Sequence, residues 1–242
     1  SFPGRPVKRR RMSQLYLITP PRIDDDFLAS LEMALDAGPV SALQIRLKDH
    51  DETEIRRLAP PLIKAAQERG VAAILNDSPE LADALGCDGV HIGQSDGRVK
   101  DARAIMGKDR TVGVTCHASR HLAMVAGEAG ADYVAFGAFF DSTTKASEHR
   151  PDLEILEWWS TLFEIPCVTI GGITPENCKP LIDAGADFLA VSGSVWNGDE
   201  VAAIKAFAGN LKKELSGAMK SGGPAKALDV CKTVAPSIAA SS

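Results

Sequence analysis

Two cations and an amide alternate along one short segment, ALQIRLK at residues 42–48. Side chains alternate between the two faces of a β-strand, so Gln44, Arg46 and Lys48 are expected to share one face, opposite three aliphatic side chains. A cation buried without a partner is costly, so such a face requires anions nearby. Two interpretations stay open, which are ion pairs with carboxylates of the protein and a bound polyphosphate.

Carboxylates that could supply those anions, or bind a metal, follow two later segments. Asp77 ends AAILND and Asp96 follows GVHIG, with Asn76 and Gln94 close by. Mg²⁺ prefers oxygen ligands and is usually held by one or two carboxylates together with water and phosphate oxygens. We therefore predict a magnesium site at Asp77 and Asp96. The alternative is that each aspartate caps the helix that follows it.

Hydroxyl groups and a further cation lie in two other segments. GVTCH contains Thr115, and DSTTK supplies Ser142, Thr144 and Lys145. The lysine would be a third cation for a polyphosphate. His91, in the middle of GVHIG, is more often a hydrogen-bonded core imidazole than a ligand.

Two glycines and a serine within residues 170–195 suggest a second anion site. IGGI and VSGSV contain Gly172, Ser192 and Gly193, where main-chain N–H groups could hold a phosphate. The alternative is that these glycines only form tight turns. We predict a bound monophosphate because both loops carry the pattern.

Eight short aliphatic segments recur along the chain and position these groups. They read LYLIT, ALQIRLK, AAILND, GVHIG, TVGVT, YVAFGAF, CVTIGGI and FLAVSGSV. The intervening segments mostly show the three- and four-residue apolar spacing of helices. Aliphatic strands buried on both faces indicate a parallel sheet covered by helices. We predict a single (β/α)₈ TIM barrel over residues 13–215, with the candidate residues at the carboxyl ends of its strands.

The composition and the chain ends exclude several classes of function. A net charge of −5 argues against nucleic-acid or anionic-membrane partners, and no apolar run is long enough to span a bilayer. Five scattered cysteines fit reduced thiols, so we expect a cytoplasmic protein. The basic N-terminal extension (residues 1–12) and the C-terminal tail (216–242), rich in Ser, Ala, Gly and Pro, are expected to be flexible.

Taken in order, these motifs resemble the thiamine phosphate synthase family over residues 15–215. The resemblance rests on Gln-x-Arg-x-Lys, Asn-Asp, DGVHIGQSD, GVTCH, GAFFDSTTK and the two glycine-containing loops. It implies that hydroxymethylpyrimidine pyrophosphate loses pyrophosphate to leave a pyrimidine-methyl cation. The nitrogen of hydroxyethylthiazole phosphate then attacks this cation, which gives thiamine phosphate.

The resemblance also implies the role of each candidate residue. The catalytic residues would be Arg46, Lys48, Thr115 and Lys145. Substrate would be bound by Gln44, Asn76, Ser142, Thr144, Gly172, Ser192 and Gly193, and Mg²⁺ by Asp77 and Asp96. The sequence departs from the family pattern at Leu47, Ser78, Thr115, Asp141, Ser142 and Asp152, where the family usually has other residues.

Two other functions stay open on the sequence. One is an isomerase like the thiazole tautomerase branch of the family, although the resemblance implies that this branch has lost much of the charged set found here. The other is a non-catalytic regulatory protein that binds a thiamine-related phosphate, because a binding site and an active site can share one cradle. A homodimer is also left open.

Overall fold

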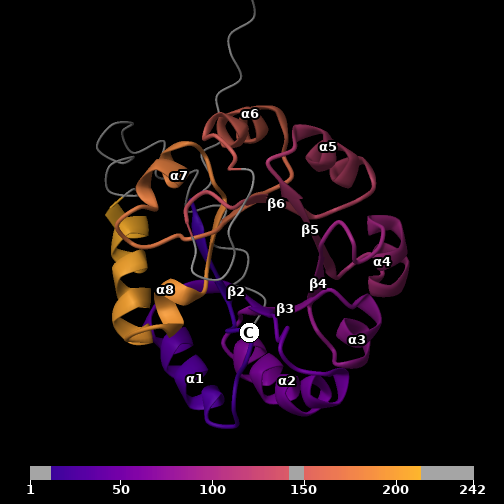
Figure 1. Cartoon of the computed structure of the whole chain (residues 1–242), viewed down its shortest axis with the longest axis vertical. Helices are drawn as coiled ribbons and strands as arrows, with labels where there is room; N and C mark the ends of the chain where they lie inside the picture. Colours follow the sequence, from indigo (N-terminus) through magenta and orange to yellow (C-terminus); the bar gives the residue numbers. More distant parts are fainter. Residues whose placement is uncertain (1–11, 142–149, 214–242) are drawn as a thin grey trace, which may run out of the picture.

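The eight predicted strands close into one parallel barrel. The computed structural model describes residues 12–141 and 150–213, and in it each strand pairs with the next and β8 pairs with β1 (Figure 1). The strands are β1 (Gln14–Ile18), β2 (Val40–Ile45), β3 (Ala72–Asn76), β4 (Gly89–Ile92), β5 (Thr111–His117), β6 (Tyr133–Gly137), β7 (Cys167–Ile170) and β8 (Phe188–Val191). The predicted (β/α)₈ barrel is confirmed.

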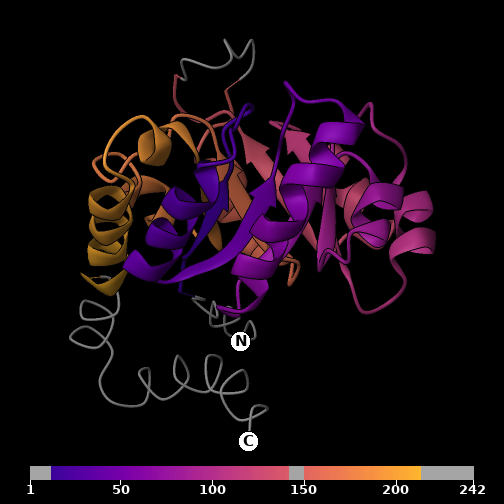
Figure 2. The same ribbon diagram turned by 90° about the horizontal axis from the view of Figure 1, so that it is seen from below.

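Helices follow the strands and form the outer ring that Figures 1 and 2 show from two directions. They are α1 (Phe27–Ala37), α2 (Glu52–Gln67), α3 (Pro79–Ala84), α4 (Val99–Met106), α5 (Arg120–Glu128), α6 (Glu154–Leu162), α7 (Lys179–Asp183) and α8 (Gly193–Trp196). Residues 200–213 are also helical. No helix in the described part of the chain is long and apolar enough to cross a membrane. Residues 1–11 of the predicted extension and the whole predicted tail lie outside the described residues.

The alternation along β2 separates two regions of the core. Leu43, Ile45 and Leu47 belong to the large aliphatic cluster that joins the outside of the barrel to the helices. Gln44 faces the opposite way, into the barrel, where its residue is only 4% exposed. The strand itself ends at Ile45, before the expected end at residue 48, because the next N–H, that of Arg46, donates to Thr19 Oγ1 (2.9 Å).

A short sequence motif recurs before β4, β6 and β8, as GCD (86–88), GAD (130–132) and GAD (185–187), and it holds neighbouring strands together at the amino-terminal end of the barrel. Its glycine has a positive φ and follows the end of a helix, and this occurs at Gly86, Gly130 and Gly185. The aspartate two residues later accepts a hydrogen bond from an N–H at the start of the preceding strand. The pairs are Asp88 with Ala73 (2.8 Å), Asp132 with Val112 (2.7 Å) and Asp187 with Cys167 (2.8 Å). The self-similarity in the sequence therefore has a structural cause, at the end opposite the candidate site.

Candidate active site

Lys48, Asp77 and Asp96 form a charged cluster at the carboxyl-terminal mouth of the barrel, although they follow three different strands. The Lys48 ammonium forms an ion pair with the Asp77 carboxylate. The carboxyl groups of Asp77 and Asp96 lie within hydrogen-bonding range of each other. The side chains of Lys48 and Asp77 are 43% and 30% exposed, so the cluster is open to a ligand from solvent.

The two carboxyl groups of this cluster differ in acidity. Burial and the neighbouring Asp96 raise the pKa of Asp77, and this outweighs the opposing effect of Lys48. Burial also acts to raise the pKa of Asp96. Three other effects outweigh burial and lower the pKa of Asp96. They are the hydrogen bond from the Gly93 N–H to Asp96 Oδ2 (2.8 Å), the contact with Asp77 and the charge of Lys48. A further cation at the pair would favour ionisation of both groups, which suits a divalent metal.

The alternative that these aspartates cap helices is wrong. Ser78 is the N-cap of α3, and its hydroxyl accepts a hydrogen bond from the N–H of Leu81 (3.2 Å). Asp77 has a left-handed φ of 72° and lies before that cap. Helix α4 begins after Arg98 without a side-chain cap, and the Asp96 carboxylate instead accepts the N–H of Gly93. Both carboxylates are therefore available at the mouth.

A glycine beside Asp96 leaves room for its carboxylate. A Cβ atom on Gly93 would lie 2.6 Å from Asp96 Oδ2, a separation that real Cβ atoms essentially never show. Any larger residue at position 93 would displace the carboxylate from the backbone N–H that holds it. The segment after β4 is thus shaped around Asp96.

A chain of hydrogen bonds crosses the interior of the barrel below the charged cluster. Gln44 Nε2 donates to Tyr16 Oη (3.2 Å), and Tyr16 Oη contacts Tyr133 Oη (2.8 Å). Tyr133 Oη contacts His91 Nδ1 (2.8 Å), and His91 Nε2 contacts Thr115 Oγ1 (2.8 Å). The prediction that His91 is a hydrogen-bonded core imidazole is confirmed. The chain joins five strands and lines the floor of the mouth with polar groups.

The two tyrosines of this chain were not predicted from the sequence. Each occupies an inward-facing strand position, where a single aromatic residue resembles any other core residue. The structure shows that Gly113 makes room for one of them, because a Cβ atom at position 113 would fall 1.9 Å from the Tyr133 ring. Burial raises the pKa of both phenols above the ordinary value, so they stay protonated at neutral pH.

Arg46 lies close enough to this chain to act on His91 electrostatically. Burial and, second to it, the charge of Arg46 lower the pKa of His91 to about 4, although Asp96 opposes the change. Within residues 12–141 and 150–213, Lys48 has Asp77 as its ion-pair partner, whereas Arg46 has no such partner. Ion pairing inside the protein therefore accounts for one of the two cations, and the charge of Arg46 is left without a carboxylate partner among the described residues.

The depressed pKa of His91 predicts a pH dependence of stability. The unfolded chain takes up a proton near pH 6.5, whereas the folded protein does so only near pH 4, so the contribution of neutral His91 is present above pH 6.5. As the pH falls from 6.5 to 4, we expect the free energy of unfolding to drop by on the order of 3 kcal/mol from this group. Urea denaturation at several pH values measures this slope. His91→Gln, which cannot titrate, should show a smaller slope, and an equal slope in both proteins would contradict the assignment.

The glycines after β7 are explained first by packing. Gly171 and Gly172 have φ values of 104° and 60°. A Cβ atom on Gly172 would lie 2.2 Å from the carbonyl oxygen of Asp141, and one on Gly171 would lie 2.3 Å from Ala138 Cβ. The close approach that excludes larger residues is thus between this loop and the segment after β6. These contacts give the tight-turn alternative a physical basis at this loop.

The loop after β8 is more open to a ligand. Gly193 begins α8 and is exposed, and among the described residues a Cβ there would meet the Asn197 side chain. Ser192 donates its hydroxyl to the Thr19 carbonyl oxygen (3.4 Å), which joins this loop to the end of β1. In the part of the chain that the structure describes, Ser194 Oγ is buried without a hydrogen-bond partner. Backbone N–H groups here remain candidates for a phosphate.

The remaining predicted residues are placed as follows. Asn76 ends β3 opposite His91, with its residue partly buried. Ser142, Thr144 and Lys145 lie outside the described residues. Among the described residues there is no group of three or more His, Cys, Asp and Glu side chains that could bind a metal. Two carboxylates beside an open mouth nevertheless fit Mg²⁺, which completes its shell with water and substrate phosphate oxygens.

Comparisons with known proteins show what the whole chain is similar to. The family profile described as thiamine monophosphate synthase matches residues 15–195. The thiamine-phosphate synthase of Erythrobacter litoralis is 60% identical over 200 residues, which cover 81% of this chain and 94% of that protein. The enzyme of the same name from Rhodospirillum centenum is 57% identical over 185 residues, covering 76% and 89%. The solved thiamine phosphate pyrophosphorylase of Pyrococcus furiosus superposes with a TM-score of 0.73 at 26% identity, covering 85% and 98%.

Proposed function

The chain belongs to the thiamine monophosphate synthase family, and we propose that it joins hydroxymethylpyrimidine pyrophosphate to hydroxyethylthiazole phosphate. In this transferase reaction the bond between the pyrimidine methylene carbon and the pyrophosphate oxygen breaks first. The electron pair leaves with pyrophosphate, and a pyrimidine-methyl cation remains. The thiazole nitrogen then forms a bond to the methylene carbon, and the products are thiamine phosphate and pyrophosphate.

The observation that carries this proposal is the meeting of Lys48, Asp77 and Asp96 at one mouth, close to His91, on which the charge of Arg46 also acts. A guanidinium group can bind two phosphate oxygens at once, and a lysine acts as a point charge. Positive groups held in place beside the leaving group stabilise the charge that develops on it. We assign Arg46 and Lys48 to the pyrophosphate on this basis.

Asp77 and Asp96 would hold Mg²⁺ in this scheme. When bound, the ion supplies positive charge next to the leaving pyrophosphate. Binding it would also relieve the repulsion that contributes to the raised pKa of Asp77. Asn76 and Lys145 complete the proposed pyrophosphate set, in which the lysine rests on the resemblance alone.

The organic parts of the substrates would occupy the floor and the far side of the mouth. Gln44 and Thr115 are the two ends of the hydrogen-bonded chain, and we assign them to the pyrimidine, with Thr115 also near the reacting carbon. The thiazole phosphate would be held by Gly172, Ser192 and Gly193, with Ser142 and Thr144 as further contacts. A reactive cation must be kept from water, and the mostly apolar walls of the barrel interior serve this purpose.

One assay tests the proposed function. The protein is incubated with both substrates, with and without Mg²⁺, and thiamine phosphate and pyrophosphate are quantified. We expect equal amounts of the two products, and we expect both to depend on the metal. Isomerisation of the thiazole without joining would favour the tautomerase function, and tight binding without turnover would favour a regulatory protein. Absence of product in the complete mixture would contradict the proposal.

A further inference from the structure

Arg46 and Lys48 lie on a loop, so something must hold that loop in place. The β2–α2 loop, residues 46–51, runs from the end of β2 to the start of α2. It lies against the β1–α1 loop, residues 19–26. Two hydrogen bonds donated by backbone N–H groups join them, from Arg46 to Thr19 Oγ1 (2.9 Å) and from Asp49 to the Pro21 carbonyl oxygen (3.0 Å). The second of these contacts reaches Asp49, and the residues after it, which lead the loop into α2, have a further support.

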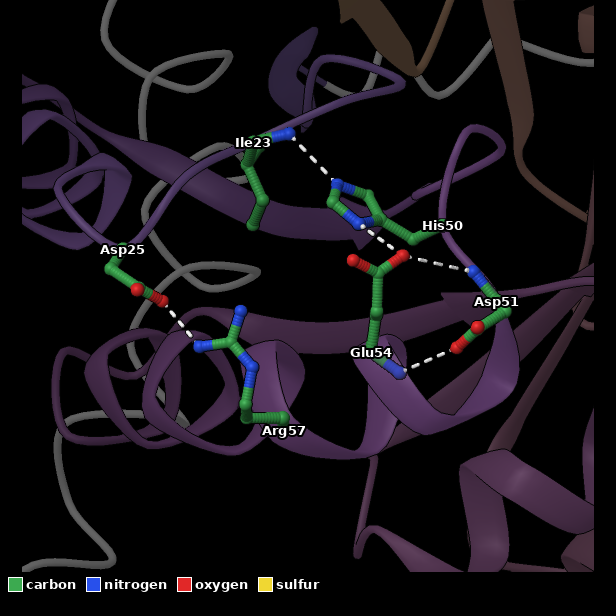
Figure 3. A network of polar contacts seen from close by, with 6 residues as sticks. All are labelled: Ile23, Asp25, His50, Asp51, Glu54 and Arg57. Carbon is green, nitrogen blue, oxygen red and sulfur yellow. Dashed lines mark hydrogen bonds and ion pairs between the residues drawn. The ribbon is translucent and has the colours of Figure 1, made fainter.

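His50 supplies that support through both of its ring nitrogens, as Figure 3 shows. The N–H of Ile23 donates to His50 Nε2 (3.1 Å), and His50 Nδ1 contacts Glu54 Oε2 (3.1 Å). The side chain of His50 is only 4% exposed. A backbone N–H can only donate, so Nε2 must be the acceptor and must carry no proton. Nδ1 then carries the hydrogen and donates it to Glu54.

The carboxylate of Glu54 also belongs to the N-terminal cap of α2. It accepts the N–H of Asp51 (3.3 Å), and Asp51 accepts the N–H of Glu54 (2.8 Å), which completes a capping box. His50 therefore connects the β1–α1 loop to a helix start that is itself well held. The link runs from one loop, through the imidazole, into the first turn of α2.

We propose that His50 is a positioning residue for the diphosphate site. It holds the β2–α2 loop so that Arg46 and Lys48 are directed into the mouth before substrate arrives. The inference rests on the proposed function for the identity of the substrate. A displacement of about 1 Å in a binding group can lower the rate on the order of 100-fold, so support of this kind has a measurable effect.

A second contact between the same segments provides a matched control. Arg57 on α2 forms an ion pair with Asp25 of the β1–α1 loop (Figure 3). Their side chains are 60% and 76% exposed, so water and salt screen this pair. It joins the same two segments as His50 but not through a buried acceptor. Arg57→Ala should therefore leave the site as it is.

The experiment measures inorganic pyrophosphate binding with Mg²⁺ by calorimetry and the KM values of both substrates. In His50→Ala we expect the pyrophosphate Kd and the KM of the pyrimidine substrate to rise about 10-fold, with the KM of the thiazole phosphate unchanged. His50→Gln should restore both values, because its amide oxygen can accept the Ile23 N–H. Arg57→Ala should match the wild type. If His50→Ala does not fold, His50→Leu, which fills the space without an acceptor, takes its place.

The outcomes separate this inference from the proposed function. An unchanged pyrophosphate Kd in a folded His50 variant overturns the positioning role, and so does an equal loss in Arg57→Ala. Equal rises in the KM values of both substrates also overturn it, since they indicate a general structural effect. Failure of the wild type to form thiamine phosphate would count against the proposed function, while the pyrophosphate Kd would still decide the role of His50.

Discussion

Asp77→Asn is expected to lower kcat/KM on the order of 100-fold or more, the loss typical of removing one electrostatic group from a catalytic site. The substitution keeps the size of the side chain, and asparagine tolerates the left-handed backbone that position 77 requires. It removes the charge that pairs with Lys48 and one of the two proposed metal ligands. We also expect a higher Mg²⁺ concentration for half-maximal activity, measured by magnesium titration of the initial rate.

A matched control for Asp77 lies three residues further along. Glu80 is exposed in the first turn of α3, so Glu80→Gln removes the same charge from the same segment without touching the cluster. Its rate should match the wild type. Because Ser78 caps α3, Asp77→Asn should also keep the melting temperature close to that of the wild type. A near-wild-type rate in Asp77→Asn would show that the cluster is not the reaction site.

Arg46→Ala is expected to cause a comparable loss, on the order of 100-fold in kcat/KM, because the guanidinium is the cation of the mouth without an ion-pair partner in the described residues. Arg46→Lys keeps the charge but not the two-point contact with phosphate, so its kcat/KM should lie between those of Arg46→Ala and the wild type. Steady-state kinetics with varied pyrimidine substrate measures both.

A second measurement tests the position of Arg46 independently of turnover. The positive charge of Arg46 contributes to the lowered pKa of His91, so its removal should raise that pKa. NMR titration of the His91 ring in Arg46→Ala reports this change. Arg56→Ala, which removes an exposed cation paired with Glu52, is the control and should leave both the rate and the titration unchanged. Full activity together with an unaltered His91 titration in Arg46→Ala would place the guanidinium away from the mouth.

Three departures from the family pattern leave the charged set intact. Leu47, where an acid is usual, faces the core between barrel and helices and is 4% exposed, so it does not reach the mouth. Ser78 has a structural task as the cap of α3. Thr115 keeps a hydroxyl, and that hydroxyl contacts His91. None of the three removes a cation or a carboxylate from the cluster.

Local sequence patterns were sufficient for the architecture and for the rim on which the candidate residues lie. Period-two alternation told which side of β2 faces inward, since it depends only on backbone geometry. Parallel strands all end at one side, so Lys48, Asp77 and Asp96, which follow three of them, could be assigned to a common mouth without coordinates. The resemblance added roles to these positions, including those outside the described residues.

Contacts between distant residues were decided by the tertiary structure. The sequence left Asp77 equally suited to capping and to metal binding. The structure excludes the capping role, because Asp77 lies in a left-handed turn and Ser78 is the N-cap of α3. No sequence pattern indicated that Tyr16 and Tyr133 meet across the barrel, or that His50 reaches Ile23. The physical reason is that periodicity specifies the direction of a side chain, whereas its partner depends on strand register, barrel closure and loop geometry, which are properties of the whole chain.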